Sequence, residues 1–354
     1  MRNNLKIEVL HLPDYEHPFR HNNDGWIGGD CAFSLPISKN RVLWLFGDSF
    51  VQDKNLYSRT GAVLINNSIA IQQGNLLQES DSLHFYWKKK QGRHRAFFVN
   101  EAEPGFLWPL SATLIKGKLF VFCVRIEITD PEKVFGFRQI GNEIFHVENP
   151  DDQPDQWNMI VHKLPFQRRL GSFGSNFLVT DDYLYIYGYR NLRSGWNNAI
   201  INLIIARIKM DQTHEIYDLK NWEYLDGKSG QWTSNIQEMK PVIEHFTTEY
   251  SVTFLPKIKK YVLIANAWKH PHPITVRFSD TPYGPFSKPK IIYHCPEIEW
   301  SPSYFCYAAK AHPELAEGDA ELIVSYMTNS KVLRDCFEDL RIYFPRFVKI
   351  LFHE

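Results

Sequence analysis

The amino-acid sequence predicts an all-β protein, a five-bladed β-propeller, and three observations lead to this prediction. Aromatic residues make up 15% of the chain, a composition that suits β-sheets. Strand-like segments recur as five hairpin signals, each with two apolar runs around a polar turn. These hairpins begin about 68 residues apart on average, and five such units account for nearly all of the 354 residues.

The five hairpins follow one another with few helical patterns between them. The innermost strands are expected to begin near Asp30, Trp108, Phe173, Glu249 and Tyr304. The paired segments are Cys31–Leu35 with Val42–Phe46, Leu110–Ile115 with Leu119–Val124, Asn176–Val179 with Tyr183–Tyr187, Ser251–Leu255 with Tyr261–Ala265, and Tyr304–Lys310 with Glu321–Tyr326. Further β-rich segments after each hairpin complete four-stranded blades, which favours a propeller over a sandwich.

We expect a single domain over residues 1–354, with Leu5–Leu10 adding a strand to the last blade. A last blade that contains both ends of the chain is typical of propellers. Lys331–Leu340 is a candidate for a short helix. The alternative organisation is two β domains that meet near residue 170.

The charge balance and the cysteines exclude several classes of protein. Lys+Arg and Asp+Glu are 40 each, so the sequence predicts no nucleic-acid partner. The five cysteines are widely spaced, which argues against a disulfide framework or a zinc site. Neither a membrane span nor a signal peptide is recognisable. We therefore expect a cytoplasmic monomer without a membrane partner, with secretion by a signal-independent route as the alternative.

Two aspartates in the first hairpin are the strongest candidates for chemistry. A regular hairpin around Lys39 places Asp30 opposite Asp48, with the Cβ atoms ~4.5–5.5 Å apart. Two carboxylates at that distance repel each other unless a proton, a metal or a cation compensates. Glycoside hydrolysis requires such a pair, and the short separation favours a retaining mechanism. Alternatively, Asp48 caps the turn after its strand and Asp30 binds backbone amides.

The same register argument places two arginines at the corresponding position of the next blades. A turn centred on Lys116-Gly117 puts Arg125 opposite Trp108, and a turn centred on Asp181-Asp182 puts Arg190 opposite Phe173. Both guanidinium groups are candidates for binding substrate oxygens or lowering a carboxylate pKa. A single β-bulge would instead make either one an ordinary edge-strand arginine.

The remaining candidates come from the inner strands and from one loop. Glu249 begins the fourth inner strand and is the third candidate catalytic carboxylate, whereas Asn176 and Tyr307 are candidate substrate ligands. His270 lies in a loop of alternating His and Pro residues and is expected to contact substrate rather than a metal. No cofactor is expected, although the acidic pair could hold a cation such as calcium.

Several motifs resemble those of a known family of propellers. The three matching regions are Gly28–Asp30 with Leu43–Asp48, Arg277–Ser287, and Tyr307–Leu315 with Glu321–Tyr326. They resemble domain-of-unknown-function family 4185, whose relatives include the endo-D-arabinanases of glycoside hydrolase family 183. The resemblance implies a five-bladed propeller, and by motif position it implies that Asp30 and Asp48 carry catalysis.

Three functions are consistent with these features. The first is a glycosidase that cleaves a glycan or oligosaccharide, with Trp108 stacking on a sugar face. The second is a glycoside phosphorylase, in which Arg125, Arg190 and the histidines would bind phosphate as the nucleophile. The third is a propeller that binds a carbohydrate or a protein without turnover. Dependence of product formation on phosphate separates the first two, and binding without turnover identifies the third.

Overall fold

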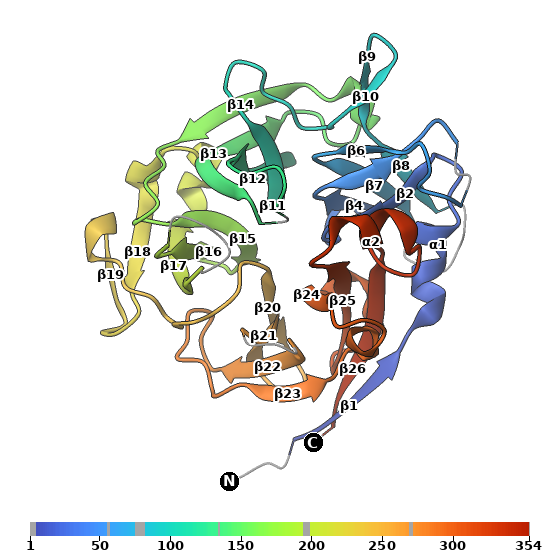
Figure 1. Ribbon diagram of the computed structural model, residues 1–354. Coiled ribbons are helices and arrows are strands. Elements are labelled where there is room, and N and C mark those ends of the chain that lie inside the picture. Colours follow the sequence, from blue (N-terminus) through green and yellow to red (C-terminus); the bar gives the residue numbers. More distant parts are fainter. Residues whose placement is uncertain are drawn as a thin grey trace. The chain divides into compact units, whose positions relative to one another are not determined.

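The computed structural model describes residues 5–54, 57–74, 82–133, 135–193, 199–268 and 272–353. These residues form mostly antiparallel β-sheets, which divide into two compact units. Unit 1 comprises Met1–Phe97, Glu249–Asp280 and Phe286–Glu354, and unit 2 comprises Phe98–Thr248 and Thr281–Pro285. Each unit is described separately below, with the element labels of Figure 1. A single propeller domain over residues 1–354 stays a prediction.

The first sheet of unit 1 contains the hairpin that was predicted to carry the aspartates. Its strands, in spatial order, are β3 (Phe33–Ser38), β4 (Arg41–Phe46), β7 (Ser68–Gln73) and β8 (Leu83–Tyr86). Strand β4 is a nearly continuous apolar run because it is buried on both faces. The pairs from Phe33–Leu45 to Pro36–Val42 lie in the predicted register, but the register shifts next to the turn, where Ser38 pairs with Arg41.

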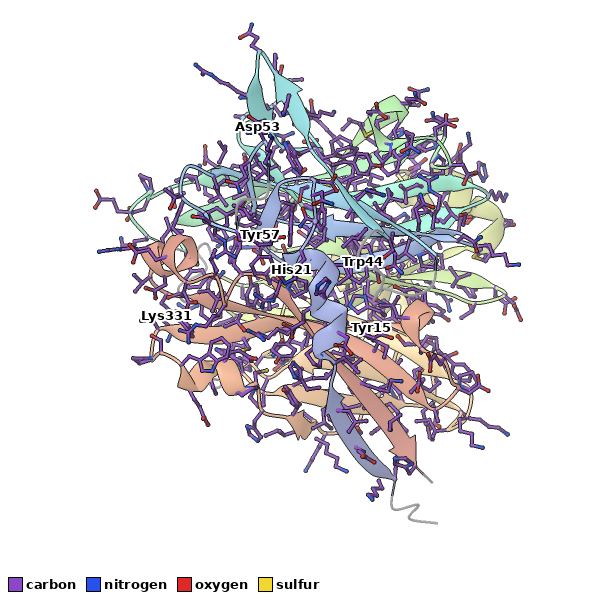
Figure 2. All side chains as sticks on the ribbon, turned by 90° about the vertical axis from the view of Figure 1, so that its right-hand side faces the viewer. Tyr15, His21, Trp44, Asp53, Tyr57 and Lys331 are labelled. Atoms are coloured by element: carbon purple, nitrogen blue, oxygen red, sulfur yellow. The ribbon has the colours of Figure 1, made fainter. Side chains whose placement is uncertain are left out.

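A smaller sheet continues the same hairpin beyond the aspartates. It consists of β2 (Trp26–Gly29), β5 (Ser49–Val51) and β6 (Val63–Ile65). A separate two-stranded ribbon of β9 (Lys88–Lys90) and β10 (Arg93–Arg95) belongs to unit 1. Asp53, near this ribbon, forms an ion pair with Lys89, in which Oδ1 lies 2.7 Å from Nζ (Figure 2). The basic Lys88–Arg95 segment is thus a hairpin.

The other two sheets of unit 1 contain the last third of the chain and the N-terminal strand. One sheet consists of β20 (Tyr250–Leu255), β21 (Lys260–Asn266), β22 (Ile274–Ser279) and β23 (Lys290–Tyr293). The other consists of β24 (Tyr304–His312), β25 (Glu321–Ser330), β26 (Pro345–His353) and β1 (Lys6–His11). Strand β1 pairs with β26, so both ends of the chain enter one sheet (Figure 1).

Unit 2 begins with a four-stranded sheet whose register departs from the prediction. Its strands are β11 (Phe106–Ile115), β12 (Lys118–Ile128), β13 (Phe137–Val147) and β14 (Met159–Leu164). The predicted register holds from Ser111 to the turn, but a β-bulge between Pro109 and Ser111 shifts the pairs beyond it. Arg125 consequently pairs with Leu107, and its predicted position opposite Trp108 is wrong.

The second sheet of unit 2 contains a similar bulge. Its strands are β15 (Ser172–Val179), β16 (Tyr183–Asn191), β17 (Ile201–Lys209), β18 (Trp222–Asp226) and β19 (Gln231–Thr233). The predicted register holds from Asn176 to the turn and is lost at a bulge that contains Gly174. Gly174 has a φ of +104°, which glycine adopts without strain. Phe173 therefore faces Gly188, and its predicted position opposite Arg190 is wrong.

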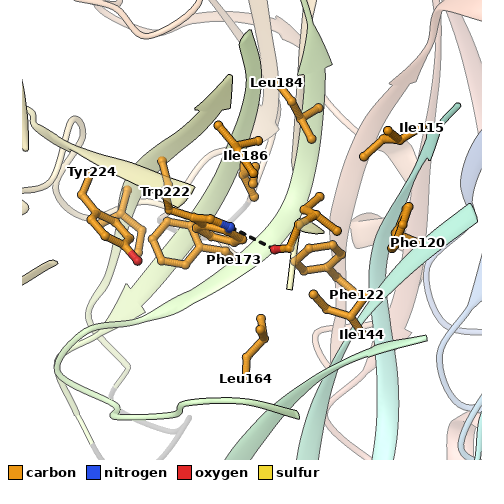
Figure 3. Packing of buried hydrophobic residues seen from close by; sticks show 14 of the residues in the cluster. Ile115, Phe120, Phe122, Ile144, Leu164, Phe173, Leu184, Ile186, Trp222 and Tyr224 are labelled. Carbon is orange, nitrogen blue, oxygen red and sulfur yellow. Dashed lines mark hydrogen bonds between the residues drawn. The ribbon is translucent and has the colours of Figure 1, made fainter. Parts of the chain in front are cut away.

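The apolar core of unit 2 lies between its two sheets (Figure 3). Phe122, Ile186 and Trp222 are each 1% exposed or less. The indole of Trp222 donates a hydrogen bond to the carbonyl of Ile216 at 2.9 Å, which satisfies its only polar atom. In unit 1, buried side chains such as Val262, Val324 and Ile350 fill the corresponding space between the last two sheets.

The helices of the described residues are short. The two α-helices are α1 (His17–Arg20) and α2 (Leu333–Glu338), and α2 confirms the helix predicted within Lys331–Leu340. The 3-10 helices are η1 (Pro13–Glu16), η2 (Pro154–Gln156), η3 (Met210–Glu215), η4 (Leu219–Asn221), η5 (Ile236–Glu238), η6 (Pro296–Glu299) and η7 (Pro313–Leu315). Among these residues, no helix has the length and apolar character needed to cross a bilayer.

Candidate active site

The two aspartates lie where the first hairpin of unit 1 passes from one sheet to the other. Asp30 separates β2 from β3, and Asp48 separates β4 from β5. The backbone N–H of Asp30 donates to the Asp48 carbonyl at 2.7 Å, and the Gly47 N–H donates to the Asp30 carbonyl at 2.7 Å. Asp30 therefore faces two consecutive residues, Gly47 and Asp48, as in a β-bulge. This local break brings both aspartates to the same point of the hairpin.

The side chain of Asp30 is half-buried and held by two donors. Its Oδ1 accepts a hydrogen bond from the Tyr307 hydroxyl and a longer one, 3.4 Å, from the Cys31 thiol. A Cβ atom at Gly47 would be 3.3 Å from the Asp30 Cβ, so glycine leaves room for this carboxyl group. Burial raises the pKa of Asp30 above its ordinary value, against the opposing effect of its hydrogen bonds with Tyr307 and Cys31.

Tyr307 belongs to a chain of hydrogen bonds that fixes its hydroxyl group. The Asn329 amide donates to the Tyr307 hydroxyl oxygen at 3.3 Å, and the Cys336 thiol donates to the Asn329 carbonyl oxygen at 3.0 Å. A β-bulge follows Tyr307 in β24, with Ala308 at a φ of +55°. The Ala309 N–H in this bulge donates to the Asn266 side chain at 2.8 Å. The structure thus brings the predicted Tyr307 and Asp30 together.

Asp48 lies on the other side of the break and is also half-buried. Its Oδ1 accepts a weak hydrogen bond from the Asn66 amide at 3.5 Å. Burial and the negative charges of Asp30 and Asp48 together raise the pKa of Tyr343, so both carboxylates lie within electrostatic reach of that phenol.

Glu249, the third predicted carboxylate, immediately precedes β20 and joins the same region through charge. The pKa of the Cys31 thiol is raised first by burial, then by the negative charge of Asp30, and then by the negative charge of Glu249. Glu249 also favours the charged form of Lys310, which is 3% exposed and has its Nζ 4.2 Å from the centre of the Phe33 ring. Burial nevertheless lowers the pKa of Lys310 to about 7. Lys310 is thus a cation that loses its proton easily, close to three acidic groups: Cys31, Glu314 and Glu249.

A second polar network adjoins Lys310. The Ser34 hydroxyl lies 2.5 Å from His312 Nδ1 and donates to Glu314, while His312 Nε2 lies 2.7 Å from the Ser325 hydroxyl. His312 is completely buried, and burial, assisted by the charge of Lys310, lowers its pKa to about 3. Burial also raises the pKa of Glu314. Each of these polar side chains therefore has a fixed hydrogen-bond partner.

His312 should make the protein sensitive to acid. Its pKa is about 3 when folded, against an ordinary value of 6.5, so its contribution to stability is complete above pH 6.5 and is lost progressively toward pH 3. Replacing His312 with Gln should therefore flatten the fall in the free energy of unfolding by up to ~1.4 kcal/mol per pH unit. Urea unfolding from pH 7 to pH 4.5 measures this, with exposed His214→Gln as the control. Equal slopes in wild type and His312→Gln would refute the assignment.

The other predicted ligands lie in unit 2 or outside the described residues. Arg125 is buried in an ion pair with Glu143, Nε to Oε1 at 2.5 Å, and its other nitrogens donate to backbone carbonyls. The Trp108 ring packs edge-on against the Phe137 ring, and the two ring centres are 4.8 Å apart. His270 lies outside the residues that the structure describes.

The two remaining predicted ligands are in the second sheet of unit 2. Asn176 is 7% exposed, and its amide donates to the Phe177 carbonyl at 3.2 Å. Arg190 Nη2 donates to the Met239 carbonyl at 3.2 Å, and burial lowers its pKa. A role in substrate binding for these residues stays a prediction.

Sequence reasoning missed Lys310, Glu314 and Ser34. Lys310 lies in a strand next to three alanines, and a charged residue in such a small, apolar run is the signal that could have identified it. In the described part of the chain, no group of three or more His, Cys, Asp or Glu side chains is arranged to hold a metal ion.

Comparison with solved structures identifies the class of fold. A candidate hydrolase from Bacteroides ovatus is 18% identical, with a TM-score of 0.71 over 97% of this chain and 90% of its own. The catalytic domain of the Coprinopsis cinerea GH62 α-L-arabinofuranosidase is 6% identical, with a TM-score of 0.50 over 93% of this chain and 97% of its own. The chain has the all-β fold of five-bladed propellers, which confirms the fold class predicted from its sequence.

The family follows from the sequence itself. The model described as "Domain of unknown function (DUF5005)" matches residues 13–352, and the chain belongs to this family. The motifs of the sequence resemble family 4185, whereas the family that matches is DUF5005. No curated protein matches the chain at a significant level.

Proposed function

We propose that the protein is a glycoside hydrolase whose active site is centred on Asp30 and Asp48. The observation that carries the proposal is the break in the first hairpin, where a hydrogen bond between Asp30 and Asp48 holds the two backbones together at 2.7 Å. Burial raises the pKa of Asp30, which favours its protonated form. Asp48 is the second carboxylate at this break. One protonated and one ionised carboxyl group are what glycoside hydrolysis requires.

We assign the roles of the two aspartates from the raised pKa of Asp30 alone. Asp30 donates its proton to the glycosidic oxygen as the bond to the anomeric carbon breaks, and the Asp48 carboxylate attacks that carbon. Water then displaces Asp48 and gives its proton to Asp30, so the sugar is released with retained configuration. Glu249 and Lys310 adjust the local charge, because Lys310 neutralises part of the field of the acidic groups.

The substrate that we propose is an oligosaccharide, bound by a monomer. The fold likeness to an α-L-arabinofuranosidase domain makes pentose-containing glycans the first substrates to test. Relation to family 4185 and its endo-D-arabinanases is the finer proposal, supported by the motifs at Asp30 and Asp48. Both proposals rest on a carboxylate pair that needs no bound cofactor for this chemistry.

The proposal is tested by turnover on a panel of arabinose-, xylose- and hexose-containing oligosaccharides. Wild type, Asp48→Asn and Asp280→Asn are compared with and without inorganic phosphate, and the anomer of the first product is read by NMR. Asp280 is an exposed carboxylate of the same unit, paired with Lys260 at the surface, so its variant is the matched control. We expect turnover without phosphate, retained configuration, and loss of at least ~10³-fold only in Asp48→Asn.

Other results would replace the proposal with a different function. Product formation that requires phosphate would identify a phosphorylase. Binding of a sugar by wild type and Asp48→Asn alike, without turnover by either, would identify a carbohydrate-binding propeller. Inverted configuration would keep the hydrolase but assign Asp48 as the base for water.

A further inference from the structure

Unit 2 contains a hollow that none of the predicted functions uses. It is an open depression where the segment after β14 meets the end of β16, with about 330 Å³ of free space when the adjoining solvent is counted. The lining residues are Gln139, Phe166, Arg168, Gly171, Ser172, Tyr189, Asn191 and Arg193. No carboxylate is among these lining residues.

The floor of the hollow is polar and fixed in position. Gln139 Nε2 donates to the Ser172 hydroxyl at 2.6 Å and to Asn142 Oδ1 at 2.7 Å. Gln139 Oε1 in turn accepts a hydrogen bond from the Tyr189 hydroxyl at 3.0 Å. Ser172 and Tyr189 are 1% and 2% exposed, so these groups have little freedom to move. A floor of this kind can present hydrogen-bonding groups to a ligand without reorganisation.

Gly171 allows the segment after β14 to approach this floor. Its φ is +91°, and a Cβ atom there would be 2.6 Å from both Ile204 Cδ1 and the Tyr189 carbonyl oxygen. A larger residue would push the segment away, and with it Phe166 and Arg168. The close approach therefore depends on glycine at this position.

The rim of the hollow is cationic. Arg168 and Arg193 are exposed, and within the described part of the chain neither guanidinium group makes a hydrogen bond or ion pair. Guanidinium groups bind carboxylate and phosphate oxygens through paired hydrogen bonds. Phe166 adds a half-exposed aromatic ring, which suits the apolar face of a sugar.

We propose that this hollow binds a sugar that carries a negative charge, either a carboxylate or a phosphate. Arg168 and Arg193 bind the anionic group, the Phe166 ring contacts the sugar, and the Ser172 hydroxyl donates its proton to a sugar oxygen. All of these groups lie in unit 2, so the proposal is independent of the hydrolase activity assigned to Asp30 and Asp48. A sugar carboxylate and a sugar phosphate share the same chemistry, a sugar ring that carries an anionic group.

Calorimetric titration of the full chain tests this proposal with four probes. These are D-glucuronate, D-glucose 6-phosphate, inorganic phosphate and uncharged D-glucose. We expect at least one of the first two to bind, and to bind about tenfold or more tightly than glucose or phosphate alone. Arg168→Gln and Arg193→Gln should each weaken that binding about tenfold, and 0.5 M NaCl should weaken it further.

Arg169→Gln is the matched control, because Arg169 is exposed, adjacent in sequence and absent from the lining of the hollow. It should change the affinity less than about twofold. Preference for glucuronate or for the sugar phosphate decides which anion the site takes. The proposal fails if neither anionic sugar binds more tightly than glucose and phosphate, or if Arg168→Gln and Arg193→Gln both bind like wild type. The Asp48→Asn variant should bind the probe normally, which keeps this test separate from that of the hydrolase.

Discussion

Replacing Asp30 with Asn should lower kcat by about 10²–10⁴-fold while leaving the melting temperature equal to that of wild type or higher. The loss follows from the role of Asp30 as proton donor, because an amide cannot protonate the leaving oxygen. The stability result follows from burial, which raises the pKa of Asp30 and thus penalises its charged form in the folded protein. A neutral amide removes that penalty.

Tyr307 provides a separate test of which role Asp30 has. Its hydroxyl donates to Asp30 Oδ1 and favours the ionised carboxylate, so Tyr307→Phe should raise the pKa of Asp30. If Asp30 is the acid, activity persists to a higher pH in this variant, and the alkaline limb of the kcat profile moves upward. If Asp30 is instead the nucleophile, the acidic limb moves upward.

The outcomes of these measurements are distinct. Full activity in Asp30→Asn would show that the site is assigned wrongly. A melting temperature several degrees lower, together with lost activity, would show that Asp30 holds the hairpin together.

The first hairpin shows how much of the site the sequence alone could predict. Its short polar turn and alternating core residues define the register up to Phe33, and Asp30 and Asp48 then follow at the break. The sequence also indicates the β-rich blades, because apolar runs and turns recur along the whole chain. The sequence does not show that Gly47 also pairs with Asp30. This pairing requires a residue without a side chain, because the Asp30 carboxyl group occupies the adjacent space.

The bulges in unit 2 explain why the arginines were misplaced. The bulge between Pro109 and Ser111 shifts the pairing of every residue before it, including the partner of Arg125. Pro109 and Gly174 are local signs of these bulges, but packing against neighbouring strands decides where the pairing shifts. Lys310 was missed for a similar reason: it follows the bulge in β24, so its face cannot be read from alternation.

Replacing Arg125 with Met should destabilise the protein by ~3–5 kcal/mol, because it leaves the buried carboxylate of Glu143 without its partner. The two side chains are 4% and 2% exposed, and Arg125 Nε lies 2.5 Å from Glu143 Oε1. The variant also loses the hydrogen bonds that the guanidinium group donates to the backbone carbonyls of Glu103, Pro104 and Asn100. Thermal unfolding should show a melting temperature lower by about 4–7 °C.

The double variant Arg125→Met/Glu143→Leu is the control for this prediction. It removes the unpaired charge as well, and it should recover part of the lost stability, since apolar replacements of a buried ion pair are often well tolerated. Loss of the ion pair with a normal melting temperature and weakened sugar binding would instead support the role of Arg125 as a substrate ligand. The double-mutant cycle therefore separates the structural role of this arginine from a functional one, because only a structural role makes the effect of Arg125→Met depend on Glu143.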